Sequence, residues 1–267
     1  MVEAGYTIPA TSSGMSMLNL KDVFVSFKET KVLNSISCSF DAGATIGVIG
    51  PNGSGKTTLF NCISGFVPCT AGTIELRGQE IHHLQPYQRA QLGLGRVFQN
   101  FGIFREMTLL ENIQIALESR RDSPSGFWPW SKLTKQLQEE AMTFLQELHL
   151  EEKALHKAGT LSGGQMRLLE IARTLAVGAD LFLLDESTAG VSPRMKDDIA
   201  GSIKRLQELG KTVLIIEHDI TFIQKFCSRI VVLEEGRIVL DGSPERVRTD
   251  VRLQDIYFGR EPQQVTV

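Results

Sequence analysis

The chain starts with alternating apolar and polar residues and continues with short runs that are almost entirely apolar. The alternation predicts two antiparallel strands, at residues 18–27 and 32–40, joined by a turn at 28–30. Apolar runs of four or five residues instead predict strands buried on both faces, as in a parallel sheet covered by helices. Such runs occupy residues 45–49, 181–184 and 212–216. The pattern therefore predicts an α/β fold with an antiparallel unit near its N-terminal end.

Helical periodicity marks much of residues 100–178, which we expect to form a helical insertion between strands of the α/β core. Thr108 and Glu111 have the spacing of a capping box at its first helix. Further helices are expected at 59–66, 86–91, 133–148, 163–177, 194–209, 244–248 and 251–258. Further short strands are expected at 72–76, 80–81, 96–98, 229–233 and 238–240. We expect one domain, residues 17–260, between flexible tails at 1–16 and 261–267.

Residues 122–132 are rich in proline, glycine and serine, which predicts a loop between two helices of the insertion. This segment carries both tryptophans of the chain, Trp128 and Trp130. Exposed rings there would suit contact with a partner protein or a membrane surface. The alternative is that the rings fold back onto the neighbouring helix.

Composition excludes several classes of protein. Hydrophobic residues make up 42% and charged residues 22% of the 267, as in ordinary globular proteins. The net charge of −3 and the lack of a long basic run argue against non-specific binding to nucleic acids. No apolar run approaches the roughly 18–20 residues of a membrane span. The four cysteines lack metal-ligand spacing and are expected to be buried or half-buried thiols in a reducing compartment.

A nine-residue segment between a predicted strand and a predicted helix has the full pattern of a phosphate-binding loop. It comprises Gly50, Pro51, Asn52, Gly53, Ser54, Gly55, Lys56, Thr57 and Thr58. Its glycines allow several backbone N–H groups to point at one anion, at the positive end of a helix dipole. Lys56 is expected to reach the β- and γ-phosphates of a nucleotide, and the Thr57 hydroxyl to ligate Mg²⁺.

Polar residues that end other predicted strands are candidates for the chemistry at the γ-phosphate. Asp185 and Glu186 follow a buried run; we expect Asp185 to hold Mg²⁺ and Glu186 to deprotonate the attacking water. His218 ends the next buried strand and should emerge at the same sheet edge, in contact with the γ-phosphate. Gln99 ends a further strand and is expected to ligate Mg²⁺. Glu186, His218 and Lys56 are the predicted catalytic residues.

A second anion site is predicted where Ser162, Gly163, Gly164 and Gln165 open a helix of the insertion. The phosphate loop already serves the β- and γ-phosphates. A second site on a separate part of the fold therefore suggests that one nucleotide is shared between two subunits.

These motifs, GPNGSGKTT at 50–58, Gln99, LSGGQ at 161–165, LFLLDE at 181–186 and His218, resemble the ordered motif set of ATP-binding cassette (ABC) ATPases. The resemblance covers nearly the whole chain, and LSGGQ separates this family from other P-loop NTPases. It implies a RecA-like core with an antiparallel β-subdomain and a helical subdomain. It also implies a head-to-tail dimer that holds two ATP molecules, each between the phosphate loop of one subunit and the LSGGQ segment of the other.

Phe27, at the end of the first predicted strand, falls where the family places an aromatic residue that stacks on the nucleotide base. Spacing alone favours an ordinary core or edge-strand phenylalanine at this position, and the resemblance shifts the prediction to base stacking.

Finer matches resemble the ATPases of bacterial branched-chain amino acid importers, and the lipopolysaccharide-export and urea-importer ATPases are close. They lie at residues 50–66, 96–100, 104–112, 170–173, 189–193 and 257–259. Two residues depart from the family pattern. Ser187 replaces the usual proline and loosens the turn after Glu186, and Ser192 replaces the usual Asn or Asp in a loop that touches the partner subunit.

The resemblance implies an ATP-hydrolysing, Mg²⁺-dependent subunit that energises a membrane transporter. It would pair with a second ATPase, identical or paralogous, and with permease subunits at the cytoplasmic face of the inner membrane, and would itself neither span the membrane nor bind nucleic acid. Two alternatives remain. A soluble ABC protein acting on ribosomes or DNA is disfavoured by the single cassette without coiled coil or zinc hook. A cassette that binds ATP without hydrolysing it is disfavoured by Glu186, His218 and LSGGQ.

Overall fold

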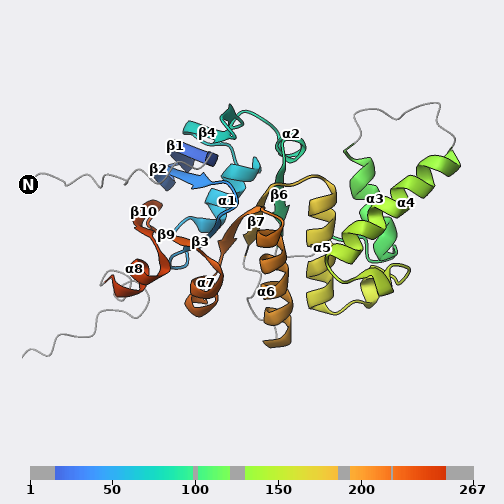
Figure 1. Cartoon of the computed structure of the whole chain (residues 1–267). Coiled ribbons are helices and arrows are strands. Elements are labelled where there is room, and N and C mark those ends of the chain that lie inside the picture. Colours follow the sequence, from blue (N-terminus) through green and yellow to red (C-terminus); the bar gives the residue numbers. More distant parts are fainter. Residues whose placement is uncertain (1–15, 99–101, 121–129, 186–192, 218, 251–267) are drawn as a thin grey trace, which may run out of the picture.

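The computed structural model describes residues 16–98, 102–120, 130–185, 193–217 and 219–250. Figure 1 shows a central mixed sheet, with an antiparallel sheet against one side and a group of helices extending from the other. This arrangement agrees with the predicted α/β core with an antiparallel unit and a helical insertion. Residues 1–15 and 261–267 of the predicted tails, the helix expected at 251–258 and Trp128 lie outside the described residues, whereas Ser16 is the first residue of β1 rather than the end of a tail.

Six strands form the larger sheet in the order β10-β9-β3-β8-β7-β6. They are β3 (Thr45–Ile49), β6 (Leu94–Val97), β7 (Leu181–Asp185), β8 (Thr212–Ile216), β9 (Arg229–Glu234) and β10 (Arg237–Gly242). All neighbours are parallel except β9 and β10, which form an antiparallel hairpin. Every residue of β3, β7 and β8 is buried, which confirms that the uniform apolar runs are central strands.

The smaller sheet is antiparallel and has the order β2-β1-β4-β5. Its strands are β1 (Ser16–Phe27), β2 (Thr30–Asp41), β4 (Ala71–Leu76) and β5 (Gln79–Glu80). The alternation in β1 and β2 turns one face inward, where Leu18, Ile36 and Phe40 join a core that also contains Ile46 and Phe60. This core fixes the smaller sheet against the larger one and against the first helix.

Eight α-helices are described. They are α1 (Lys56–Ser64), α2 (Pro86–Gln91), α3 (Leu109–Glu118), α4 (Trp130–Glu147), α5 (Gly163–Ala176), α6 (Pro193–Glu208), α7 (Ile220–Phe226) and α8 (Pro244–Thr249). The predicted capping box is confirmed, because Glu111 N donates to Thr108 Oγ1 (3.2 Å) and Thr108 N to Glu111 Oε2 (2.7 Å). The short helix α7 was not predicted; Asp219 caps it by accepting a hydrogen bond from Phe222 N.

Two helix starts differ from the predictions. Helix α1 begins at Lys56 rather than at residue 59, because Gly55 adopts a left-handed conformation that turns the loop directly into the helix. Trp130 was wrongly placed in a loop and is the first residue of α4. The prolines and the glycine of this segment, which favour a loop, all precede Trp130 in the sequence.

Helices α3, α4 and α5 pack on one another and share a core with the second face of the larger sheet. This core contains Ile113, Leu145 and Leu169 from the helices and Phe182 and Leu184 from β7. Two 3₁₀ turns, Glu151–Lys153 and Ala158–Thr160, connect α4 to α5. Among the helices of the described chain, none combines the length and the hydropathy needed to cross a membrane.

The four cysteines are free thiols, and burial agrees with the prediction: Cys38, Cys62 and Cys227 are buried and Cys69 is half-buried. Burial raises the pKa of Cys227 to about 12, so this thiol stays protonated at neutral pH.

Arg89 on α2 is a buried cation that closes the C-terminal end of α1. Its guanidinium donates to the carbonyl oxygens of Cys62 and Ile63 (2.7 Å each), His82 (2.9 Å) and Leu84 (3.0 Å). The last carbonyls of a helix have no partner within the helix, and a cation there also complements the helix dipole. Arg89 therefore fixes the far end of the helix that carries the phosphate loop.

We expect Arg89→Leu to lower the free energy of unfolding by about 2–4 kcal/mol, because it leaves several buried carbonyl groups without donors. Urea denaturation followed by circular dichroism measures this loss. Gln91→Ala, an exposed change on the same helix, is the control. Equal unfolding midpoints for the two variants would contradict the role of Arg89.

Candidate nucleotide-binding site

The predicted phosphate loop lies where β3 ends, between β2 and the turn that joins β9 to β10. Gly50 has φ 151°, and a Cβ atom there would collide with the carbonyl oxygen of Leu233. Gly55 has φ 102°, and its Cβ would lie 3.0 Å from the carbonyl oxygen of Val32. The turn also holds the loop directly, because Gly236 N donates to the carbonyl oxygen of Ser54 (3.0 Å). These close approaches require glycine and fix the shape of the loop.

The loop has the chemistry of an anion site. Gly55, the N-cap of α1, provides no side-chain cap, and the first turn contains no acidic residue. The Ser54 hydroxyl is buried and makes no hydrogen bond within the described part of the chain. Lys56 is buried and its Nζ donates to the carbonyl oxygens of Gly50 (2.9 Å) and Pro51 (3.0 Å). Backbone donors, a hydroxyl and an ammonium thus meet at the positive end of a helix, as phosphate binding requires.

Asp185 ends β7 as predicted, and a residue that sequence reasoning missed holds it. Arg96 on β6 donates through Nη2 to Asp185 Oδ2 (2.8 Å). Its Nη1 donates to Asn61 Oδ1 (2.6 Å) and Ser64 Oγ (2.9 Å), both on α1. Arg96 therefore ties the carboxylate to the helix that starts at the phosphate loop. The sequence did contain a signal for this role, because Arg96 is a charged residue inside an otherwise apolar strand.

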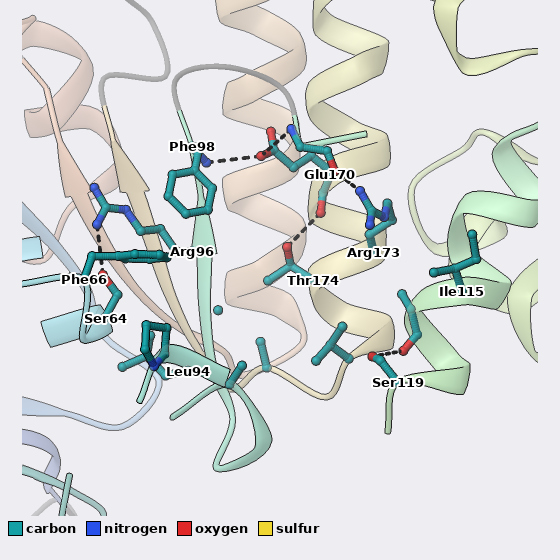
Figure 2. A pocket seen from close by; sticks show the side chains of 17 residues that line it. Ser64, Phe66, Leu94, Arg96, Phe98, Ile115, Ser119, Glu170, Arg173 and Thr174 are labelled. Atoms are coloured by element: carbon teal, nitrogen blue, oxygen red, sulfur yellow. Dashed lines mark hydrogen bonds between the residues drawn. The ribbon is translucent and has the colours of Figure 1, made fainter. Parts of the chain in front are cut away.

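Burial lowers the pKa of Arg96, and the neighbouring carboxylate opposes this change. The side chain also contacts Phe66 and Phe98, with 5.8 and 5.1 Å from its Cζ atom to the ring centroids. Figure 2 shows Arg96 beside both rings and hydrogen-bonded to the Ser64 hydroxyl. Ion pairing and ring contacts compensate part of the cost of burying this cation.

A cavity of about 340 Å³ separates the sheet side of the molecule from the helical insertion. Phe66, Leu94 and Phe98 line one wall, and Ile115 from α3 and Arg173 from α5 line the other (Figure 2). The wall is largely apolar with a few convergent charged groups, a composition typical of binding clefts. The cavity adjoins Phe98 and Gly102, which flank the segment containing Gln99.

The second predicted anion site lies at the N-terminus of α5. Ser162 and Gln165 form a capping box, in which each side chain accepts from the backbone N–H of the other (3.3 Å). Gln165 Oε1 also accepts from Lys153 Nζ (2.9 Å). Gly164 packs so closely on Asp198 of α6 that a Cβ atom would collide with its carboxylate. These partners differ from those of the phosphate loop, so the two predicted anion sites are built separately within one chain.

Phe27 lies at the end of β1 and is 49% exposed, which leaves its ring accessible; stacking on a base stays a prediction. Gln99, Glu186 and His218 lie outside the described residues, and so do Ser187 and Ser192. The strands before Glu186 and His218 are parallel neighbours, with Asp185 paired to Ile216. They therefore end side by side at one edge of the sheet.

Comparison with known proteins places this site in a family. The family model described as "ABC transporter" matches residues 33–189. The chain is 35% identical to the high-affinity branched-chain amino acid transport ATP-binding protein BraF of Pseudomonas aeruginosa, over 91% of this chain and 98% of that protein. It is 34% identical to the lipopolysaccharide export system ATP-binding protein LptB of Haemophilus influenzae, over 92% and 99% of the two chains.

Solved structures agree with this match. A nucleotide-free ATP-binding cassette from an ABC transporter superposes with a TM-score of 0.80 at 33% identity, over 92% of this chain and all of that one. A dimeric cassette in a post-hydrolysis state with ADP and phosphate superposes with a TM-score of 0.70 at 27% identity, over 85% and 99% of the two chains. The chain therefore belongs to the ABC transporter family, as one of its ATP-binding, ATP-hydrolysing subunits.

Proposed function

We propose that this chain is the energy-coupling subunit of an importer for branched-chain or related amino acids. The observation that carries the proposal is the match to a branched-chain amino acid transport ATP-binding protein, over 91% of this chain and 98% of that protein. This chain has the complete phosphate-loop motif at residues 50–58 and the complete LSGGQ motif at residues 161–165. A similar match to a lipopolysaccharide-export ATPase makes export the second candidate.

In this proposal the nucleotide binds through its phosphates to the loop of residues 50–58. The backbone N–H groups at the start of α1 and the buried Ser54 hydroxyl supply uncharged donors. Lys56 exchanges the carbonyl oxygens that it now contacts for phosphate oxygens, whose full negative charge makes them stronger acceptors. Phe27 stacks on the base.

The residues at the site also fit Mg²⁺. The Thr57 hydroxyl is exposed on the first turn of α1, and Arg96 ties the Asp185 carboxylate to the same helix. Hydroxyl and carboxylate oxygens are the hard ligands that Mg²⁺ prefers, with phosphate oxygens and water completing its shell. Thr57, Asp185 and Gln99 would hold the ion, which neutralises charge on the β- and γ-phosphates when bound. No cluster of three His, Cys, Asp or Glu side chains competes for it in the described chain.

Hydrolysis is assigned to side chains at the ends of β7 and β8. Glu186 orients a water and takes its proton as it attacks the γ-phosphate in line. His218 contacts the γ-phosphate from the adjacent strand end. Side-by-side termination of the two strands supports this pairing.

We propose that two ATPase chains, identical or paralogous, share each nucleotide head to tail. Each chain has two separately built anion sites, and one related cassette was solved as a dimer bound to ADP and phosphate. Ser162, Gly163, Gly164 and Gln165 of one chain would contact the nucleotide held by the phosphate loop of the other. ATP binding would close the dimer, and hydrolysis would reopen it.

In this proposal the motion is passed to a membrane-spanning partner, as the match to transporter ATP-binding proteins suggests. The region near Gln99–Glu106 would pass this motion to a cytoplasmic helix of a permease, and the cavity of Figure 2 adjoins Gly102 in that region. The chain would then sit peripherally on the cytoplasmic face of the inner membrane.

Affinity purification tests this assignment. Tagged Glu186→Gln is recovered with ATP from detergent-solubilised membranes, and its partners are identified by mass spectrometry. Two distinct permeases and a second, different ATPase are the result expected for an amino acid importer. A homodimer with lipopolysaccharide-export components would replace import by export, and ribosomal or DNA-repair proteins without any permease would refute the transporter assignment.

We expect Lys56→Ala to weaken ATP binding by about 10- to 100-fold, because it removes a charged donor from the phosphates. Titration with a fluorescent ATP analogue measures the dissociation constant. Lys135→Ala, which removes an exposed lysine on α4, serves as the matched control. Unchanged affinity in Lys56→Ala would exclude the proposed contact.

We expect Glu186→Gln to bind ATP normally and to hydrolyse it roughly 10²–10⁴-fold more slowly, the usual effect of losing a general base. Phosphate release by the reconstituted complex measures turnover. Near-normal turnover would show that another group activates the water.

A further inference from the structure

One buried carboxylate on α5 fastens the chain on both sides of residues 99–101. Glu170 Oε1 accepts hydrogen bonds from the backbone N–H groups of Phe98 (3.1 Å) and Gly102 (3.3 Å). Glu170 is only 4% exposed, so water hardly competes for these bonds. A single side-chain oxygen therefore joins two points of the backbone that are four residues apart.

Two arginines of the same helix hold the carbonyl groups of the same two residues. Arg167 Nη1 donates to the Phe98 carbonyl oxygen (2.5 Å) and to Glu170 Oε2 (2.8 Å). Arg173 Nη1 donates to the Gly102 carbonyl oxygen. Phe98 and Gly102 are thus each held through both N–H and C=O, and all these partners belong to α5. Figure 2 shows Glu170 and Arg173 on this helix, with the bond from Phe98 to Glu170.

Opposite charges meet in this cluster, where one carboxylate lies near two guanidinium groups. Desolvation raises the pKa of Glu170, while Arg167 and the two backbone N–H groups favour its ionised form. Removing one member would leave a buried charge or a buried peptide group without its partner, which proteins tolerate poorly. Glu170, Arg167 and Arg173 together hold Phe98 and Gly102 against the helix, and we call these three residues the α5 bracket.

The helix that carries the bracket begins at the second anion site. Ser162 caps α5, and Glu170 follows roughly two helical turns later. An α-helix of this length is stiff, so a displacement of its N-terminal end moves the bracket with it.

We propose that Glu170 is a positioning residue that makes the Ser162 end of α5 move as one body with Phe98 and Gly102, the described residues on either side of Gln99. Contact of Ser162 with the nucleotide of the partner would then be transmitted to the segment that faces the chain's own nucleotide. This inference rests on the proposed roles of Ser162 and Gln99.

The proposal requires a side chain long enough to accept from both backbone N–H groups. Two conservative variants separate the effect of this length from the effect of the charge. Glu170→Gln keeps an oxygen acceptor at the same distance from the helix but loses the charge that pairs with buried Arg167, so it should lower the unfolding midpoint while the two backbone bonds remain. Glu170→Asp keeps the charge but is one methylene shorter, so it cannot reach Phe98 N and Gly102 N together. A purely structural ion pair with Arg167 would tolerate Asp better than Gln.

Amide hydrogen exchange of the full chain without nucleotide tests the bracket itself. We expect exchange at Phe98 and Gly102 to rise about tenfold or more in Glu170→Asp, and by no more than about threefold in Glu170→Gln. Ile171→Val, a buried change one residue away, should lower the unfolding midpoint without this local effect. Faster amide exchange at Phe98 and Gly102 in Glu170→Gln than in Glu170→Asp would overturn the bridging role of Glu170.

ATP-driven dimerisation tests the coupling. In a Glu186→Gln background, we expect Glu170→Asp to weaken dimerisation with ATP by about tenfold or more, with ATP affinity of the single chain changed less than about twofold. Glu170→Gln should stay close to the parent. Normal dimerisation by Glu170→Asp, despite fast exchange at Phe98 and Gly102, would overturn the coupling. Failure of the parent itself to dimerise, with ATP bound, would instead contradict the proposed sharing of the nucleotide.

Discussion

The phosphate loop depends on close contact between backbone segments, and the rest of the site depends on the loop. Gly50 and Gly55 lie where any side chain would strike the Leu233 or Val32 carbonyl groups, so β2 and the β9–β10 turn mould the loop from outside. Parallel strands β3, β7 and β8 then bring the other polar groups to the same sheet edge. Backbone amides at a helix N-terminus are donors that need little rearrangement to bind an anion, and this is why the fold fixes them so firmly.

The buried charged residues have two kinds of role, one structural and one functional. Arg89 satisfies four carbonyl groups and has a structural role that an apolar residue cannot fill. Arg96 and Glu170 instead hold a carboxylate and a chain segment at the boundary between the sheet and the helical insertion. An apolar core would be at least as stable there, so buried ions at this boundary are better explained by positioning than by stability. The two residues are linked through Phe98, whose ring contacts Arg96 and whose N–H donates to Glu170.

The sequence predicted the parts of the fold that local patterns encode. Uniform apolar runs identified β3, β7 and β8, and the Thr108 capping box identified a helix start. The partners of Arg96 could not be predicted, because its bond to Asp185 joins residues 89 positions apart and depends on β6 lying beside β7. Glu170 was noted only as part of a family motif, since nothing in the pattern of α5 indicates which distant N–H groups its carboxylate accepts from. Local pattern thus predicts elements and motifs, whereas the bonds between motifs require the packed structure.

The most direct test of this account is a structure of the Glu186→Gln protein with ATP and Mg²⁺, determined by crystallography or electron cryomicroscopy. The account predicts a head-to-tail dimer with the β- and γ-phosphates on the amides of residues 50–58 of one chain. The γ-phosphate should also lie within hydrogen-bond distance of Ser162 of the second chain. A nucleotide whose phosphates lie away from the loop, or a dimer that leaves Ser162 remote from the nucleotide, would contradict it.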